Sequence, residues 1–175
     1  SIARDGTAGA STATSALIAG GSDIENNRLN LVEAFDTSFV RTTLDPLNAA
    51  RYDLGGVSLN GKAIFAGGRV DGSVESSYGR TVDVYDESLT HTIAEDLSLG
   101  VRNVGATALP GYAIINGIYA YGANENLVVD AYSSSLTLSQ PDPLNYVANS
   151  RLAFTSFGNY AFVRGEVYAN VYTVE

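Results

Sequence analysis

The 175-residue sequence has no cysteine, methionine or tryptophan, and it contains one lysine, Lys62, and one histidine, His91. Without cysteine, disulfides, thiolate metal sites and thiol catalysis are excluded. A single histidine cannot form a multi-histidine metal site. No apolar run approaches the length of a membrane-spanning helix. We therefore expect no enzymatic activity, no metal, no cofactor and no membrane insertion.

Basic residues are also scarce, since 10 arginines and lysines face 19 acidic residues and the net charge is −9. The arginines are dispersed along the chain. Such a surface repels a phosphate backbone unless a local basic cluster overcomes the repulsion. Nucleic acid is therefore not expected as a partner.

A unit that recurs four times dominates the sequence. Gapless copies span residues 7–21, 54–68, 104–118 and 152–166. Each has an alanine in the same place, with spacings of 47, 50 and 48 residues, and a glycine four residues later. The alanines are Ala16, Ala63, Ala113 and Ala161, and the glycines are Gly20, Gly67, Gly117 and Gly165. A period near 50 with strand-like segments indicates the blades of a β-propeller.

A second segment keeps the same period and alternates apolar and polar residues, as a strand with one face in each of two environments does. It occurs at 32–39, 82–89, 129–136 and 169–175, with aromatic residues Phe35, Tyr85, Tyr132 and Tyr172. Threonine-rich stretches follow at 40–43, 90–93 and 137–139, where β-branched side chains favour a further, outer strand. These patterns predict an all-β chain with four strands per unit and almost no helix. Six residues are predicted to be buried: Ile64, Phe65, Ile114, Ile115, Phe162 and Val163.

These residues resemble the kelch repeat, which has a Gly-Gly pair closing its second strand and a Tyr-Asp pair closing its third. Gly20-Gly21 and Gly67-Gly68 fit the first mark, and Phe35-Asp36 and Tyr85-Asp86 fit the second. The tryptophan of the fourth strand is absent. The pattern is closer to degenerate kelch-like arrays in proteins of gut Firmicutes and their phages.

The resemblance implies one propeller domain over residues 1–175, with four blades of about 48 residues at about 4–50, 51–101, 102–150 and 151–175. The last blade is incomplete, because only three copies of the outer strand are present. An open arc would leave apolar faces in water. We therefore expect a half-ring that closes by homo-association, most simply as a two-fold dimer of about eight blades. The alternatives are a segment of a longer propeller or assembly, or a compact four-bladed closure.

Tyrosines in the unequal loops after the second strands are candidate ligand-binding residues: Tyr78, Tyr119, Tyr121 and Tyr168. Tyrosine offers a rigid apolar plate with a polar hydroxyl, which suits sugars and protein surfaces. The alternative is that these side chains only cover blade edges. The other recurrent tyrosines, Tyr85, Tyr112, Tyr132 and Tyr160, are predicted to pack within blades.

Arginines lie near the start of the first strand in successive units: Arg4, Arg51, Arg102 and Arg151. They could form a ring that binds an anion or a partner. Alternatively, each holds its own blade together by binding backbone carbonyls or a neighbouring carboxylate of the Asp86 type.

Other polar groups offer weaker candidates. Loop carboxylates Asp23, Glu25, Asp71 and Glu75 could pair for glycosidic chemistry or simply be solvated. The segment 23–27 could hold a hard cation weakly. His91 lies in a predicted outer strand, where we expect it to face solvent rather than to act as a general base.

The sequence therefore favours a non-enzymatic binding or structural module that recognises protein or glycan. A component of a phage particle or bacterial surface assembly fits this prediction, with an extracellular, cell-surface or virion location favoured over the cytoplasm. The alternative is a hydrolase or lyase that acts on polysaccharide through loop carboxylates.

Overall fold

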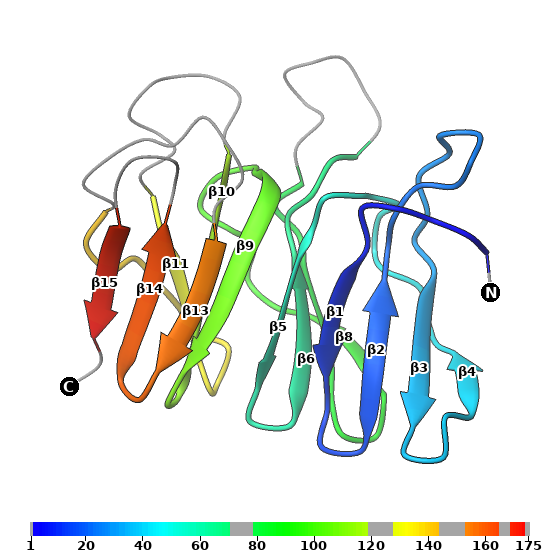
Figure 1. Cartoon of the computed structure of the whole chain (residues 1–175), viewed down its shortest axis with the longest axis horizontal. Coiled ribbons are helices and arrows are strands. Elements are labelled where there is room, and N and C mark those ends of the chain that lie inside the picture. Colours follow the sequence, from blue (N-terminus) through cyan, green and yellow to red (C-terminus); the bar gives the residue numbers. More distant parts are fainter. Residues whose placement is uncertain (1, 71–78, 119–127, 144–152, 165–168, 174–175) are drawn as a thin grey trace.

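The computed structural model is all-β, as predicted (Figure 1). It describes residues 2–70, 79–118, 128–143, 153–164 and 169–173. Within these ranges there is no helix, and hence none that could cross a membrane. The strands form four antiparallel sheets, and in each sheet the strands neighbour one another in chain order.

The four sheets follow the repeat units. The first contains β1 (Ala8–Ser11), β2 (Ser15–Ala19), β3 (Val32–Asp36) and β4 (Arg41–Thr43). The second contains β5 (Gly55–Leu59), β6 (Lys62–Ala66), β7 (Val82–Tyr85) and β8 (His91–Ile93). The third contains β9 (Arg102–Leu109), β10 (Tyr112–Ile118), β11 (Asp130–Ser133) and β12 (Leu138–Ser139). The fourth contains β13 (Ala153–Phe157), β14 (Tyr160–Arg164) and β15 (Ala169–Thr173). The short threonine-rich stretches are outer strands, as predicted.

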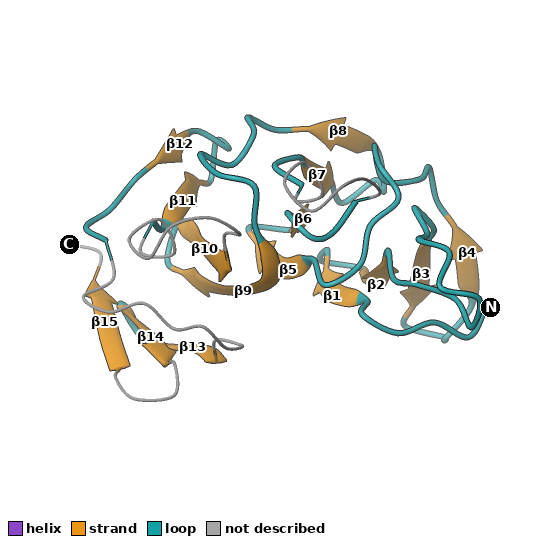
Figure 2. Ribbon diagram, turned by 90° about the horizontal axis from the view of Figure 1, so that it is seen from above, coloured by secondary structure: helices purple, strands orange, loops and turns teal. Residues whose placement is uncertain are grey.

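The sheets stand side by side in a curved row (Figure 2). Their first strands, β1, β5, β9 and β13, contact one another on the concave side, whereas β4, β8 and β12 lie on the convex side. The first and fourth sheets are at opposite ends of the row, which does not close into a ring within the described residues.

Apolar side chains between neighbouring sheets form the core. Leu17 and Phe65 share the cluster between the first and second sheets. Five of the six predicted core residues are buried, with exposed fractions of at most 3%: Ile64, Phe65, Ile114, Ile115 and Val163. The burial prediction is therefore confirmed for these five residues.

The sixth burial prediction, Phe162, is wrong. This residue is 38% exposed, because its side chain points away from the third sheet and no further sheet among the described residues covers that face. Among the tyrosines, Tyr85 and Tyr132 are buried as predicted, but Tyr112 and Tyr160 are 36% and 48% exposed. Each of the two stands at the first position of its strand, directly after the hairpin turn and thus at the end of its sheet.

A pair of glycines ends β2 and lets the chain entering the second sheet come close. Gly20 and Gly21 have φ values of +66° and +103°, which favour glycine. The backbone N–H of Gly21 donates to the carbonyl of Arg51 at 2.9 Å. A Cβ on Gly20 would lie 2.6 Å from the same oxygen. Gly67 and Gly68 repeat this arrangement in the second sheet, where Gly68 N–H donates to Val101 O at 2.8 Å.

Candidate functional site

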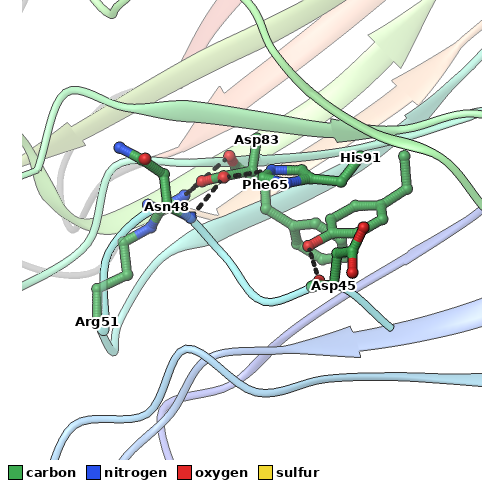
Figure 3. Close-up of polar contacts among 7 residues, drawn as sticks. Asp45, Asn48, Arg51, Phe65, Asp83 and His91 are labelled. Carbon is green, nitrogen blue, oxygen red and sulfur yellow. Dashed lines mark hydrogen bonds and ion pairs between the residues drawn. The ribbon is translucent and has the colours of Figure 1, made fainter. Parts of the chain in front are cut away.

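A group of buried polar side chains lies between the first and second sheets (Figure 3). Its centre is Asp83 of β7, which is fully buried. The Asp83 carboxylate accepts a hydrogen bond from the Asn48 backbone N–H at 2.8 Å and lies 2.7 Å from His91 Nε2. It also forms an ion pair with Arg51. Buried charges are stable only when paired and hydrogen-bonded, and Asp83 meets both conditions.

Arg51 has no exposed surface, so no external ligand reaches it in this structure. Besides Asp83, its guanidinium donates to the carbonyl of Phe65 at 3.2 Å. This is the structural role considered for these arginines, but the carboxylate involved is Asp83 rather than Asp86. Asp86 instead accepts hydrogen bonds from the backbone N–H groups of its own turn.

Arg4 plays a similar part in the first sheet. It donates to the carbonyl of Leu31 at 3.0 Å and to the Glu33 carboxylate at 2.9 Å. Burial lowers the pKa of Arg4, and the attraction of Glu33 opposes that shift.

Arg102 does not repeat Arg51. The carbonyl of Arg51 accepts a hydrogen bond from the N–H of Gly21, and the carbonyl of Val101 accepts the corresponding bond from the N–H of Gly68. The residue in the third unit that is equivalent to Arg51 is therefore Val101. Arg102 is partly buried in β9, and Arg151 lies outside the described residues. Within the described chain, the arginines therefore do not form the equivalent ring considered from the sequence.

His91 is not the solvent-facing residue that the sequence predicted. Its side chain is 17% exposed, because it lies against Asp83 and stacks on the Tyr85 ring with 4.9 Å between centroids. The Tyr85 hydroxyl donates to the Asp45 carbonyl at 2.7 Å. Together these contacts fasten the link between the first two sheets, residues 44–54, to β7.

The third sheet repeats this fastening. Asp130 accepts hydrogen bonds from Ser98 N–H at 3.0 Å and Ser98 Oγ at 2.7 Å, and the Tyr132 hydroxyl donates to Glu95 O at 2.8 Å. Burial, followed by nearby carboxylates, raises the pKa of both Tyr85 and Tyr132. Sequence reasoning missed these contacts, although an acid stands two residues before the aromatic residue in three units, as Glu33, Asp83 and Asp130.

The acidic loop after β2 is organised around its own backbone. Asp23 accepts hydrogen bonds from the backbone N–H groups of Glu25 and Asn27, both at 2.9 Å. The Asn27 side chain also donates to Asp23 at 3.0 Å and is the main reason that the Asp23 pKa is lowered. A glycosidase general acid requires a raised pKa, so Asp23 does not fit that role. Asp71 and Glu75 lie outside the described residues.

The described residues contain no group of three or more acidic, histidine or cysteine side chains that could hold a metal ion. At 23–27, the Asp23 and Glu25 carboxylates both accept from Asn27. The carboxylate oxygens that were predicted to bind a cation weakly therefore accept hydrogen bonds from the Asn27 side chain.

An open polar hollow of about 710 Å³ lies at the end of the sheets where the β2–β3 loop is found. Segments from three successive units contribute to it. The lining residues are Asp5, Gly6, Thr7, Ser22, Asn26, Arg28, Tyr52, Asp53, Leu54, Asn103 and Val104. Of the lining residues, Arg28 lies over the Tyr52 ring at 5.3 Å from the centroid, and Arg69 also lies over this ring, at 5.7 Å.

The tyrosines predicted to bind ligand all lie outside the described residues: Tyr78, Tyr119, Tyr121 and Tyr168. No protein-family model matches the chain, and a search of curated proteins finds no match. What the structure establishes is the class: an all-β chain built from repeated antiparallel sheets.

Proposed function

We propose that this chain is a non-enzymatic recognition module of the β-propeller type, which binds a glycan in the hollow at the loop end of its sheets. The observation that carries the proposal is the hollow itself, since loop segments of the first two units and the start of β9 in the third unit line it. Loops held by a rigid scaffold are the usual place of recognition.

The lining suits a ligand rich in hydroxyl groups. Asp5 and Asp53 supply carboxylate acceptors, whereas Asn26 and Asn103 supply both donors and acceptors. A sugar hydroxyl both donates and accepts, so it matches such a mixture. A polar segment of another protein is the other outcome of the same test.

The architecture also supports the proposal. Four-stranded antiparallel sheets in chain order, with their first strands together on the concave side, are what propeller blades require. The kelch resemblance favours a virion or bacterial surface assembly as the setting for this activity.

Glycan-array and pull-down binding by the wild type and by Thr7→Arg tests the proposal. Thr7 is exposed and lines the hollow, so a long charged side chain there should abolish binding. Thr14→Arg is the matched control, because Thr14 is an exposed threonine in the β1–β2 turn at the opposite end of the sheets (Figure 1). Equal binding by both variants would contradict the placement of the site.

Bound polysaccharide should be recovered intact after prolonged incubation. Release of reducing ends that is lost on Asp71→Ala or Glu75→Ala would instead establish the hydrolase alternative.

A further inference from the structure

Each sheet has two faces, and equivalent positions of the repeat lie on the same face in all four sheets. The front face carries the residue aligned with Ile18, which is Phe65, Ile115 and Val163 in the later sheets. The back face carries the residue aligned with Leu17, which is Ile64, Ile114 and Phe162 in the later sheets. Successive strand residues point to opposite faces, which keeps the two sets apart.

Between neighbouring sheets, a back-face residue always meets a front-face residue. Leu17 and Phe65 share the cluster between the first two sheets. Ile64 and Ile115 share the next cluster, and Ile114 and Val163 share the last. All six are at most 3% exposed. The chain thus makes the same contact three times.

The front face of the first sheet and the back face of the fourth are the two faces without such a partner within the described chain. Ile18 is 38% exposed, and Ala16 is exposed although its counterparts Ala63, Ala113 and Ala161 are 0% exposed.

At the other end of the row, Phe162 is 38% and Phe157 79% exposed. Phe157 belongs to the same face as Phe162, since the register pairs it with Tyr160. Its counterparts Leu59 and Leu109 are each 4% exposed.

The polar residues on the front face of the first sheet also resemble those on the front face of the second sheet, which lies inside the row. Glu33 lies 2.9 Å from Arg4 and 2.8 Å from Arg41, both as ion pairs. In the second sheet the corresponding place holds Asp83 with Arg51 and His91, and there the first sheet and the link cover it. The first front face is therefore built like a face that a neighbouring sheet covers.

We propose that the back face of the fourth sheet in one copy of this chain packs on the front face of the first sheet in a second copy, head to tail. Phe157 and Phe162 would then meet Ile18 and Ala16 in a fourth contact of the kind the chain already makes three times. The two faces stand at opposite ends of a curved row, so two copies can complete each other as eight sheets (Figure 2). The inference concerns self-association and does not depend on the proposed glycan site.

The test is the mass in solution, measured by light scattering and native mass spectrometry over a range of protein concentrations. The wild type should have twice the mass of one chain. Ile18→Arg and Phe162→Asp should each be monomeric, because each places a charge in every copy of the contact. An equimolar mixture of the two variants should recover the dimer, since it restores one unaltered contact and one in which opposite charges meet.

Ile93→Arg and Ile93→Asp are the controls. Ile93 is 52% exposed and lies in β8 of the second sheet, away from both end faces, so these variants should remain dimeric. Unchanged far-ultraviolet circular dichroism shows that each variant is folded. A monomeric wild type, dimeric single variants, or a mixture that stays monomeric would overturn the proposal. Because mass is measured without ligand, failure here is distinct from failure of glycan binding.

Discussion

Arg51 and Asp83 form an ion pair in which neither side chain has any exposed surface. The pair joins the link after the first sheet to β7 of the second. Replacing one partner leaves an uncompensated charge in the core, whereas replacing both leaves none.

Asp83→Ala should therefore lower the free energy of unfolding by about 3–5 kcal/mol, the range for breaking a buried pair from one side. Urea denaturation monitored by circular dichroism measures the change. The double variant Arg51→Met/Asp83→Leu should lose clearly less than the single one. If the double variant lost as much as the two single variants combined, the charges would not be coupled.

Phe65→Ala should lower the free energy of unfolding by about 3–5 kcal/mol, because it opens a cavity in the cluster between the first two sheets. The same denaturation assay applies. Phe39→Ala is the control, since Phe39 is 87% exposed, and its effect should stay within about 0.5 kcal/mol. A loss below about 1 kcal/mol for Phe65→Ala would contradict the packing of β6 between two sheets.

Raised pKa values of Tyr85 and Tyr132 predict a loss of stability in alkali. An unfolded tyrosine ionises near pH 10, whereas the folded phenols stay neutral above that pH. The stabilising contribution is thus complete below about pH 10 and declines as the pH rises further, by at most about 1.4 kcal/mol per tyrosine and pH unit.

Unfolding midpoints at neutral and alkaline pH test this dependence. The double variant Tyr85→Phe/Tyr132→Phe should be less stable at neutral pH, by about 1 kcal/mol for each lost hydrogen bond. It should also lose less stability on going to alkaline pH. An alkaline loss as steep as that of the wild type would assign the effect to other groups.

Gly20→Ala should destabilise the chain more than Gly158→Ala. Both glycines have a left-handed φ, +66° and +57°, which costs a residue with a Cβ about 1–2 kcal/mol. A Cβ at Gly158 meets nothing within 4 Å, whereas one at Gly20 would lie 2.6 Å from Arg51 O. Thermal or urea unfolding of the two variants separates backbone strain from steric overlap, and equal losses would exclude the overlap.

Much of the secondary structure could be predicted from local patterns in the sequence. The repeat that aligns Ala16 with Ala63 predicted the second strand of each sheet, and the alternation around Tyr85 predicted the third. Both patterns depend on residue types that favour a strand and on the alternation of apolar and polar residues. Residues that are close together in the sequence are enough to show them.

The polar contacts were harder to predict, because their residues change identity between units. His91 takes the place of Arg41, and Val101 takes the place of Arg51. Only the folded chain brings Asp83 next to Asn48, 35 residues earlier. The signal in the sequence was the acid that stands two residues before the aromatic residue in three of the four units.

By itself, the sequence determined that the chain forms strands and where they begin and end within a few residues. It also determined which side chains share a face of each strand. The tertiary structure decided which of the alternating faces is buried. Ile114 and Phe162 occupy the same place in the repeat, yet they are 3% and 38% exposed. Apolar burial requires a neighbouring surface, and the position of a sheet in the row, rather than its own residues, decides whether that surface is present.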